Sequence, residues 1–161
     1  MAVEDADDPF RPFRPRRGRY VTLVMAIVTV LVFIIGAIIT PGPVDGEAWR
    51  VGDRIMFGGF GVLIAAFLLR YAMIRAVPTR TGLLIRNLLM THRLDWSQVV
   101  AIQFAGGDPW LKLDLTDTDI VAVMAIQKAD GPYARAEAAR LAALLEALGD
   151  PGLRHADPAG P

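Results

Sequence analysis

The chain of 161 residues contains no cysteine, which excludes a disulfide framework, a thiol nucleophile and a cysteine-ligated metal site. It has only two histidines, His92 and His155, and no third ligand stands at a metal-binding spacing from either, so no zinc site is predicted. An excess of charge of one sign is also lacking, because 17 basic residues balance 17 acidic ones. No overall field draws the chain toward nucleic acid, and no nucleic-acid partner is predicted.

Long apolar runs are what the chain has instead. The first run, from Tyr20 to Thr40, carries no charged residue. As a helix it would rise about 30 Å, the thickness of the hydrocarbon core of a bilayer. Pro41 and Pro43 end it. The alternative is a cleaved signal peptide, but the run exceeds the signal core of about 7–15 residues and no small-x-small cleavage site follows. We therefore predict a transmembrane helix over residues 20–40.

A second apolar run covers residues 55–74 and predicts a second transmembrane helix. Arg70 lies near its end, where a long side chain can reach the headgroups. The alternative is a buried helix of a soluble protein, which a neighbouring and still more apolar run disfavours. Small residues at Gly58, Gly61 and Ala65 form a stripe that allows close helix packing. We expect this stripe to contact the first span of the same chain, with a homodimer as the alternative.

Basic residues set the predicted topology. Five arginines precede the first span and further arginines follow the second, whereas the connecting loop 41–54 has only two. We therefore predict a multi-pass protein of the plasma (inner) membrane, with both termini in the cytoplasm and the loop outside. Residues 1–19 are rich in proline and charge, and residues 150–161 are polar. Both segments offer few apolar side chains to bury, so both are predicted to be disordered.

Residues 75–149 predict a small α+β domain. Two short strands flank the Thr81-Gly82 turn, and a third precedes Trp96. Further on, "WLKLDL" alternates so that its leucines, residues 111, 113 and 115, share one face of a strand. The pattern between these strands predicts an inward face made by Trp96, Val100, Ile102 and Phe104. The run "IVAVMAIQ" is apolar on both faces, as expected of a strand covered on both sides.

The period then changes to that of a helix. Asp130 or Gly131 is the predicted cap, Pro132 lies in the first turn, and Gly149 ends the helix. Glu137 stands at the edge of the apolar stripe. The stripe itself consists of Ala134, Ala138, Leu141, Leu144, Leu145 and Leu148. An amphipathic helix after several short strands must bury its stripe on an open sheet, which predicts a β roll or barrel capped by one C-terminal helix.

These features together resemble a known family. Two apolar runs followed by "VPTRTGLLIRN", "LDWSQV", a W-x-L-x-L strand and an Ala/Leu helix resemble the bacterial PH-like domain proteins. The most similar branch is actinobacterial and includes the low-molecular-weight antigen family. The resemblance covers Tyr20 to about Leu148, and its most specific part is Gly82-Leu83-x-x-Arg86-Asn87 followed by Trp96-Ser97. It implies a pleckstrin-homology-like fold of about seven strands and one helix, in membrane proteins with no catalytic residues defined.

No active site is predicted from the residues themselves. The acidic turn "DLTDTD" lacks the ligand spacing and the glycine of a calcium loop. Ser97 has no neighbouring base to activate it, and Gly106-Gly107 lacks the lysine of a phosphate loop. We therefore predict a protein that is not an enzyme and that carries no cofactor or metal.

The arginines around the second span are the candidate binding residues. A juxtamembrane arginine contributes about 1 kcal/mol against an anionic leaflet. The candidates for membrane-surface contact are Arg70, Arg75, Arg80 and Arg86, with Arg93 further along the sheet. The "TRTG" turn is too tight to form a pocket for a specific headgroup. The default role of these arginines is to set the topology; the alternative is contact with anionic bilayer lipid without headgroup specificity.

Three functions remain open at this stage. The favoured one is a membrane-anchored, non-catalytic interaction module that presents a groove or sheet edge to a protein partner at the cytoplasmic face. The second is a structural or accessory subunit that acts through its transmembrane hairpin. The third and least favoured is a membrane enzyme that uses Asp95, Asp114 or Asp117, which would require these acids to cluster in a concave site.

Overall fold

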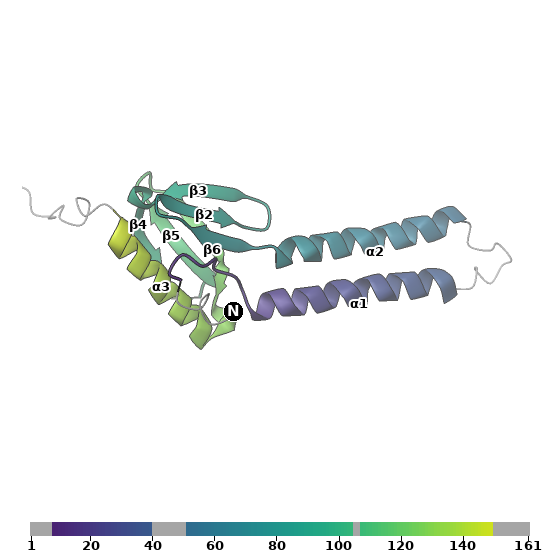
Figure 1. Cartoon of the computed structure of the whole chain (residues 1–161). Helices are drawn as coiled ribbons and strands as arrows, with labels where there is room; N and C mark the ends of the chain where they lie inside the picture. The colour runs from purple at the N-terminus through teal and green to yellow at the C-terminus, as the bar shows by residue number, and fades with distance from the viewer. Residues whose placement is uncertain (1–7, 40–50, 105–106, 150–161) are drawn as a thin grey trace, which may run out of the picture. The chain divides into compact units, whose positions relative to one another are not determined.

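The computed structural model describes residues 8–39, 51–104 and 107–149 (Figure 1). In chain order the elements are α1 (Arg17–Ile39), α2 (Val51–Ala72), β1 (Arg75–Pro78), β2 (Gly82–Arg86), β3 (Thr91–Asp95), η2 (Trp96–Gln98), β4 (Val99–Gln103), β5 (Trp110–Leu115), β6 (Ile120–Gln127), η3 (Lys128–Asp130) and α3 (Pro132–Leu148). The described residues form two compact units: α1 and α2 are a helical hairpin, and residues 8–16 form the domain together with the described residues from Ile74 onward.

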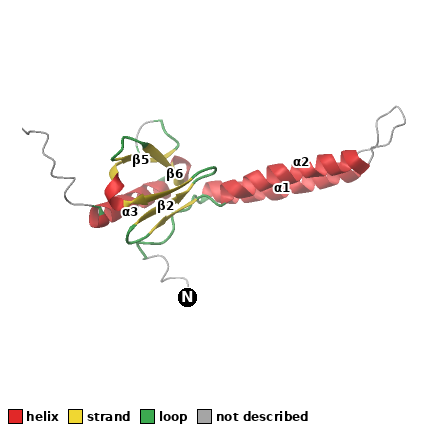
Figure 2. Ribbon diagram, turned by 90° about the horizontal axis from the view of Figure 1, so that it is seen from above, coloured by secondary structure: helices red, strands yellow, loops and turns green. Residues whose placement is uncertain are grey.

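In the hairpin, α1 and α2 lie side by side (Figures 1 and 2). Both helices are long and apolar enough to cross a membrane. Gly61 and Ala65 are buried at the contact, and a Cβ added at Gly61 would lie 2.5 Å from the Cβ of Phe33. In the first turn of α2, the guanidinium of Arg54 donates hydrogen bonds to the carbonyls of Ala37 and Ile38, in the last turn of α1.

The helix boundaries differ from the predicted ones. The helix α1 begins at Arg17, before the apolar run, and α2 begins at Val51, inside the predicted loop. Charged side chains do not stop a helix that is already nucleated. The apolar run therefore marks only the uncharged part of each helix, and the helix itself is longer. The rest of the predicted loop 41–54 lies outside the described residues, as does the tail 150–161.

The first sheet of the domain has the order β1-β2-β3, with antiparallel pairs. Alternation along these strands buries Ala76, Leu83, Ile85 and Leu94 on the inner face. The predicted turn between β1 and β2 is confirmed: Thr79 N–H donates to the Gly82 carbonyl at 2.8 Å. Glycine is required at this position because a Cβ there would collide with the Leu94 carbonyl.

The second sheet has the order β4-β5-β6, also antiparallel. Leu111, Leu113 and Leu115 of β5 are buried, as the alternation predicted. The prediction for Val100 was wrong, because its side chain is 59% exposed. Trp96 begins the short helix η2, so strand geometry starts only at Val99, and an irregular register after Val99 shifts the faces that follow.

The core lies between the inner faces of the two sheets and the buried stripe of α3, which runs alongside the sheets (Figures 1 and 2). Gly131, with φ of 58°, precedes Pro132 at the start of α3, so the predicted start is confirmed. The most buried helix positions are Ala134, Glu137, Leu141 and Leu144. The described residues form six strands, against about seven implied by the resemblance.

The prediction that residues 1–19 are disordered was wrong for the part that the structure describes. Residues 8–16 pack against the domain: residues 8–11 form a turn, and Phe13, which follows it, is completely buried. Phe13 forms an antiparallel bridge with Ala76 at the free edge of β1, through two backbone hydrogen bonds of 2.8 and 3.1 Å. Proline on both sides of Phe13 prevents a helix but is tolerated in an edge strand, which has partners on one side only.

Side chains of α3 hold this N-terminal segment from its other side. The Arg140 guanidinium lies 3.8 Å from the Phe13 ring centroid and donates to the carbonyls of Pro9 and Arg11 at 2.7 and 2.9 Å. Glu137, 3% exposed, accepts from both Arg11 and Arg140 at 2.7 Å. The segment therefore fills the space between the edge of β1 and α3, and it completes the core of the domain.

Candidate functional site

Alternation in the first sheet places three arginines on its outer face. Arg75 and Arg86 stand directly opposite each other in the register of β1 and β2, and Arg93 of β3 stands opposite Leu84. These arginine side chains are half-buried or exposed. Like charges directly opposite in a sheet destabilise it unless water or an anion lies between them. The outer face of β1–β3 is therefore a basic surface suited to anionic groups.

The structure brings together only part of the predicted set of arginines. Arg75 and Arg86 lie at the same end of the β1–β2 pair, whereas Arg80 lies in the turn at its opposite end. Arg70 belongs to the last turn of α2, in the other unit. Arg93 joins the basic face through the pairing of β2 with β3, a register that the sequence pattern did not specify.

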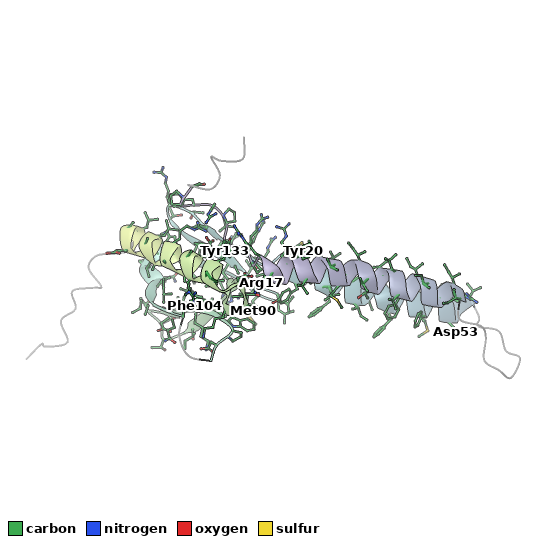
Figure 3. All side chains as sticks on the ribbon, turned by 90° about the horizontal axis from the view of Figure 1, so that it is seen from below. Arg17, Tyr20, Asp53, Met90, Phe104 and Tyr133 are labelled. Carbon is green, nitrogen blue, oxygen red and sulfur yellow. The ribbon has the colours of Figure 1, made fainter. Side chains whose placement is uncertain are left out.

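The loop between β2 and β3, residues 87–90, lies at the Arg75–Arg86 end of the first sheet. Its sequence is Asn-Leu-Leu-Met, and Leu89 and Met90 are 81% and 66% exposed. Beside the loop lies an open groove of about 420 Å³ between these side chains and β6. His92, Ile120 and Met124 contribute to its lining. Met90 is labelled among the side chains of the domain in Figure 3.

Hydrogen bonds hold the loop in place at its base. The Asn87 amide donates to the Ala122 carbonyl at 2.7 Å and accepts from the Met124 N–H at 3.2 Å, so one side chain occupies a backbone pairing position on β6. Within the loop, the Asn87 N–H donates to the Met90 carbonyl at 2.9 Å. The apolar side chains are therefore exposed by a defined turn, and not by a loop without contacts.

The acidic residues named for the enzyme alternative do not converge. Asp95 ends β3, and its backbone N–H donates to the Gln98 side-chain oxygen at 2.9 Å. Asp114 accepts from Gln103 at 2.6 Å, and Asp117 caps the next turn through the Asp119 N–H at 3.2 Å. Across residues 8–39, 51–104 and 107–149, no three acidic or histidine side chains gather in a way that could hold a metal ion.

The predicted packing stripe of α2 is also only partly used. Gly61 and Ala65 lie against α1, but a Cβ at Gly58 would have no heavy atom within 4 Å. Gly36 of α1, which the sequence analysis did not single out, approaches Phe57 closely: an added Cβ would lie 3.0 Å from the ring. Glycine and phenylalanine thus alternate across the contact, and Phe33 and Phe57 stack with centroids 4.7 Å apart.

Comparisons with known proteins agree with this architecture. Residues 74–143 match the family model described as bacterial PH domain. Three uncharacterized proteins, one from Mycobacterium bovis and two from strains of Mycobacterium tuberculosis, are 35% identical to the chain over 86 residues. That alignment covers 53% of this chain and 56% of each relative, so the chain spans just over half the length of the curated relatives it matches. No solved structure matches the chain significantly. The two sheets and α3 form a PH-like domain, and the similar proteins are actinobacterial.

Proposed function

We propose that this bacterial PH domain is a non-catalytic interaction module, held at the cytoplasmic face of the plasma membrane by the α1–α2 hairpin. The exposure of the hairpin carries the proposal. Large apolar side chains project outward along both helices (Figure 3), and those of Ile38 and Ile39 are each 69% exposed. A helix that served as the core of a soluble protein would bury such side chains. A lipid environment removes the cost of exposing them to water.

Chain connectivity supports anchoring of the domain at two points. The N-terminal segment passes into α1 between Arg16 and Arg17, and α2 is followed by β1 after only two residues. Flexible linkers between modules are usually longer and richer in glycine or serine. A domain attached in this way is concentrated at the membrane, so weak contacts with a partner suffice for binding.

The non-catalytic part of the proposal rests on how the acids are used. Glu137, the most buried acid of the described domain, is paired with two arginines that belong to the packing of the N-terminal segment. The carboxylates of Asp108 and Asp114 bond to Lys112 and Gln103. Groups engaged in local structure are poor candidates for proton transfer, because general acid–base catalysis requires a carboxyl group that is free to reach the substrate.

The basic face of β1–β3 is the part of the module that we assign to the membrane surface. Arg75, Arg86 and Arg93 present positive charge from one sheet face, and each arginine near an anionic leaflet contributes about 1 kcal/mol. A pocket of about 270 Å³ whose lining includes Leu84, Arg93 and Asp95 is open to solvent, so contact of this face with lipid would depend on the charge of the leaflet. A protein partner would then bind a surface that this contact leaves free.

Topology is tested with the cysteine-free chain. We would introduce Val44→Cys in the loop between the spans and Thr118→Cys in the β5–β6 turn, each alone, and label intact cells with an impermeant maleimide. The proposal predicts labelling of the Val44→Cys variant only, with Thr118→Cys labelled after the cells are opened. Labelling of Thr118→Cys in intact cells would place the domain outside and refute a cytoplasmic role. Failure of both proteins to sediment with membranes would refute anchoring.

A further inference from the structure

The exposed apolar side chains of the domain gather in one place. Among the described residues of the domain, the large apolar side chains that are exposed are those of Leu89, Met90, Val100 and Ile120. Three of these four line the groove beside the β2–β3 loop, and only Val100 lies elsewhere, on β4. Single exposed apolar residues are ordinary on protein surfaces, but a cluster marks a binding surface.

We propose that residues 88–90 form a wedge that inserts into the headgroup region of an anionic lipid leaflet. This inference rests on the function proposed above and adds to it a defined insertion site. Leu88, Leu89 and Met90 would enter the boundary between headgroups and acyl chains, while Arg75 and Arg86 would contact lipid phosphates. Ile120 directly follows Asp119, so it would remain at the rim of the contact and the loop would lead the insertion.

Charge identifies lipid as the occupant. The strand that leads into the loop, β2, ends at Arg86, and Arg75 of β1 stands directly opposite. Two arginines opposite each other, next to an apolar tip, match the surface of an anionic leaflet, in which phosphate groups overlie acyl chains. An apolar groove that bound a protein helix would gain nothing from this pair of like charges unless the helix were acidic.

Connectivity favours the same occupant. Arg75 is the third residue after Ala72, the last residue of the apolar helix α2. The antiparallel register then places Arg86, and with it the start of the loop, at the same end of the strand pair as Arg75. The loop therefore lies at the end of the β1–β2 pair at which the chain enters the sheet. The hydrogen bonds of Asn87 fix the turn in advance, which lowers the entropy lost on insertion.

The test uses single-cysteine variants of the full chain in nanodiscs, each carrying a nitroxide spin label. Leu89→Cys places the label at the tip. Val100→Cys is the matched control, an exposed apolar position of the same domain. Ile35→Cys, on the exposed face of α1, reports whether the hairpin is in lipid. Collision of each label with oxygen, which is enriched in lipid, is compared with collision with a nickel chelate, which stays in water.

The wedge predicts that the Leu89 label favours oxygen and the Val100 label favours nickel in discs that contain phosphatidylglycerol. Adding Arg86→Gln to Leu89→Cys should lower the ratio of inserted to free domain about fivefold.

A Leu89 label as accessible to nickel as the Val100 label, while the Ile35 label favours oxygen, overturns the wedge and leaves the anchor intact. An Ile35 label that favours nickel overturns the anchor and the wedge together. Oxygen preference at Leu89 that is unchanged by Arg86→Gln or by discs of phosphatidylcholine alone overturns the role of charge.

Discussion

At the scale of single residues, Arg140 joins the N-terminal segment to α3. Its guanidinium contacts the Phe13 ring, two backbone carbonyls of the N-terminal segment and the carboxylate of Glu137. Glu137 is nearly inaccessible, and a buried carboxylate is tolerated only when its charge is paired and its oxygens are hydrogen-bonded. Both of its oxygens are satisfied, one by Arg11 and the other by Arg140.

The duplicated tripeptide Phe-Arg-Pro in residues 10–15 gives a matched pair of substitutions. Phe13→Ala should destabilise the domain by about 3–5 kcal/mol, because it removes a fully buried ring and leaves a cavity. Phe10→Ala removes the same ring from a position that is only half-buried, and should cost much less. Thermal unfolding of the purified full chain in detergent, followed by circular dichroism of the sheet, would measure both. Equal unfolding temperatures for the two variants would contradict the packing described for Phe13.

The same repeat shows why only one register fits. A shift of the segment by three residues would bring Phe10 to the position of Phe13, and Asp8 to the position of Arg11. Asp8 would then face Glu137, and two carboxylates at a buried site repel each other. The sequence suggested neither the register nor the contact, because Arg11 and Glu137 lie 126 positions apart and no local pattern links them.

At the scale of elements, the hairpin depends on close approach at Gly61. An added Cβ there would lie 2.5 Å from both Cβ and Cγ of Phe33, and the Cβ of Phe33 cannot move without moving α1. Small residues allow helices in lipid to approach this closely, and their van der Waals contacts replace the missing hydrophobic driving force. The sequence predicted the small-residue stripe but not which of its residues contact α1. Gly61 does, whereas a Cβ at Gly58 would have no heavy atom within 4 Å.

Gly61→Ala and Gly58→Ala therefore make the same chemical change in different surroundings. We expect Gly61→Ala to weaken the hairpin, because the two helices must separate to accommodate the methyl group. Gly58→Ala should leave the packing unchanged, and the loss of a helical glycine should stabilise α2 by up to about 1 kcal/mol. Resistance of the folded chain to increasing sodium dodecyl sulfate in mixed micelles would rank the variants. A Gly61→Ala protein as resistant as wild type would show that the close contact does not hold the helices together.

The strands show what could and could not be predicted from sequence. Strict alternation in β5 identified Leu111, Leu113 and Leu115 as core residues, because a period of two leaves one interpretation. The sequence analysis assigned Trp96 to β4, but Trp96 belongs to the short helix η2 and is buried there. Its indole N–H donates a hydrogen bond to the Thr79 carbonyl at 2.9 Å. That contact is made between elements, so no periodicity within the segment could show it. The exposed loop 87–90 was missed for the same reason: its sequence is apolar, and only the fold shows that it lies outside the core.

At the scale of the whole molecule, the domain is discontinuous in sequence. Residues 8–16 precede the hairpin and the remainder follows it, yet both contribute to one core. The match to the bacterial PH domain family begins at residue 74 and does not include the N-terminal segment. The matched region alone leaves the edge of β1 and the space beside α3 without the partner that the chain supplies. The physical folding unit is therefore larger than the region of family similarity.

Removal of residues 1–15 from the full chain tests this conclusion. The truncated protein should keep its hairpin and lose stability in the domain, since it lacks Phe13 and the Arg11 partner of Glu137. A synthetic peptide of residues 8–16, added in excess, should raise the unfolding temperature of the truncated domain, because a ligand that binds only the folded state stabilises it by mass action. The intact protein should not respond, because its own segment occupies the site.

The control peptide carries Phe13→Ala and keeps every charge and proline. It should fail to restore stability, because it lacks the fully buried aromatic ring of Phe13, although it keeps the Arg11 partner of Glu137. Restoration by both peptides would assign the effect to charge alone. A truncated protein that unfolds at the same temperature as the intact chain would mean that the segment lies on the domain without supporting it.

Because the segment leads directly into α1, its loss should also remove one of the two chain connections between domain and hairpin. Limited proteolysis after residue 73 should then become faster in the truncated protein than in the intact one.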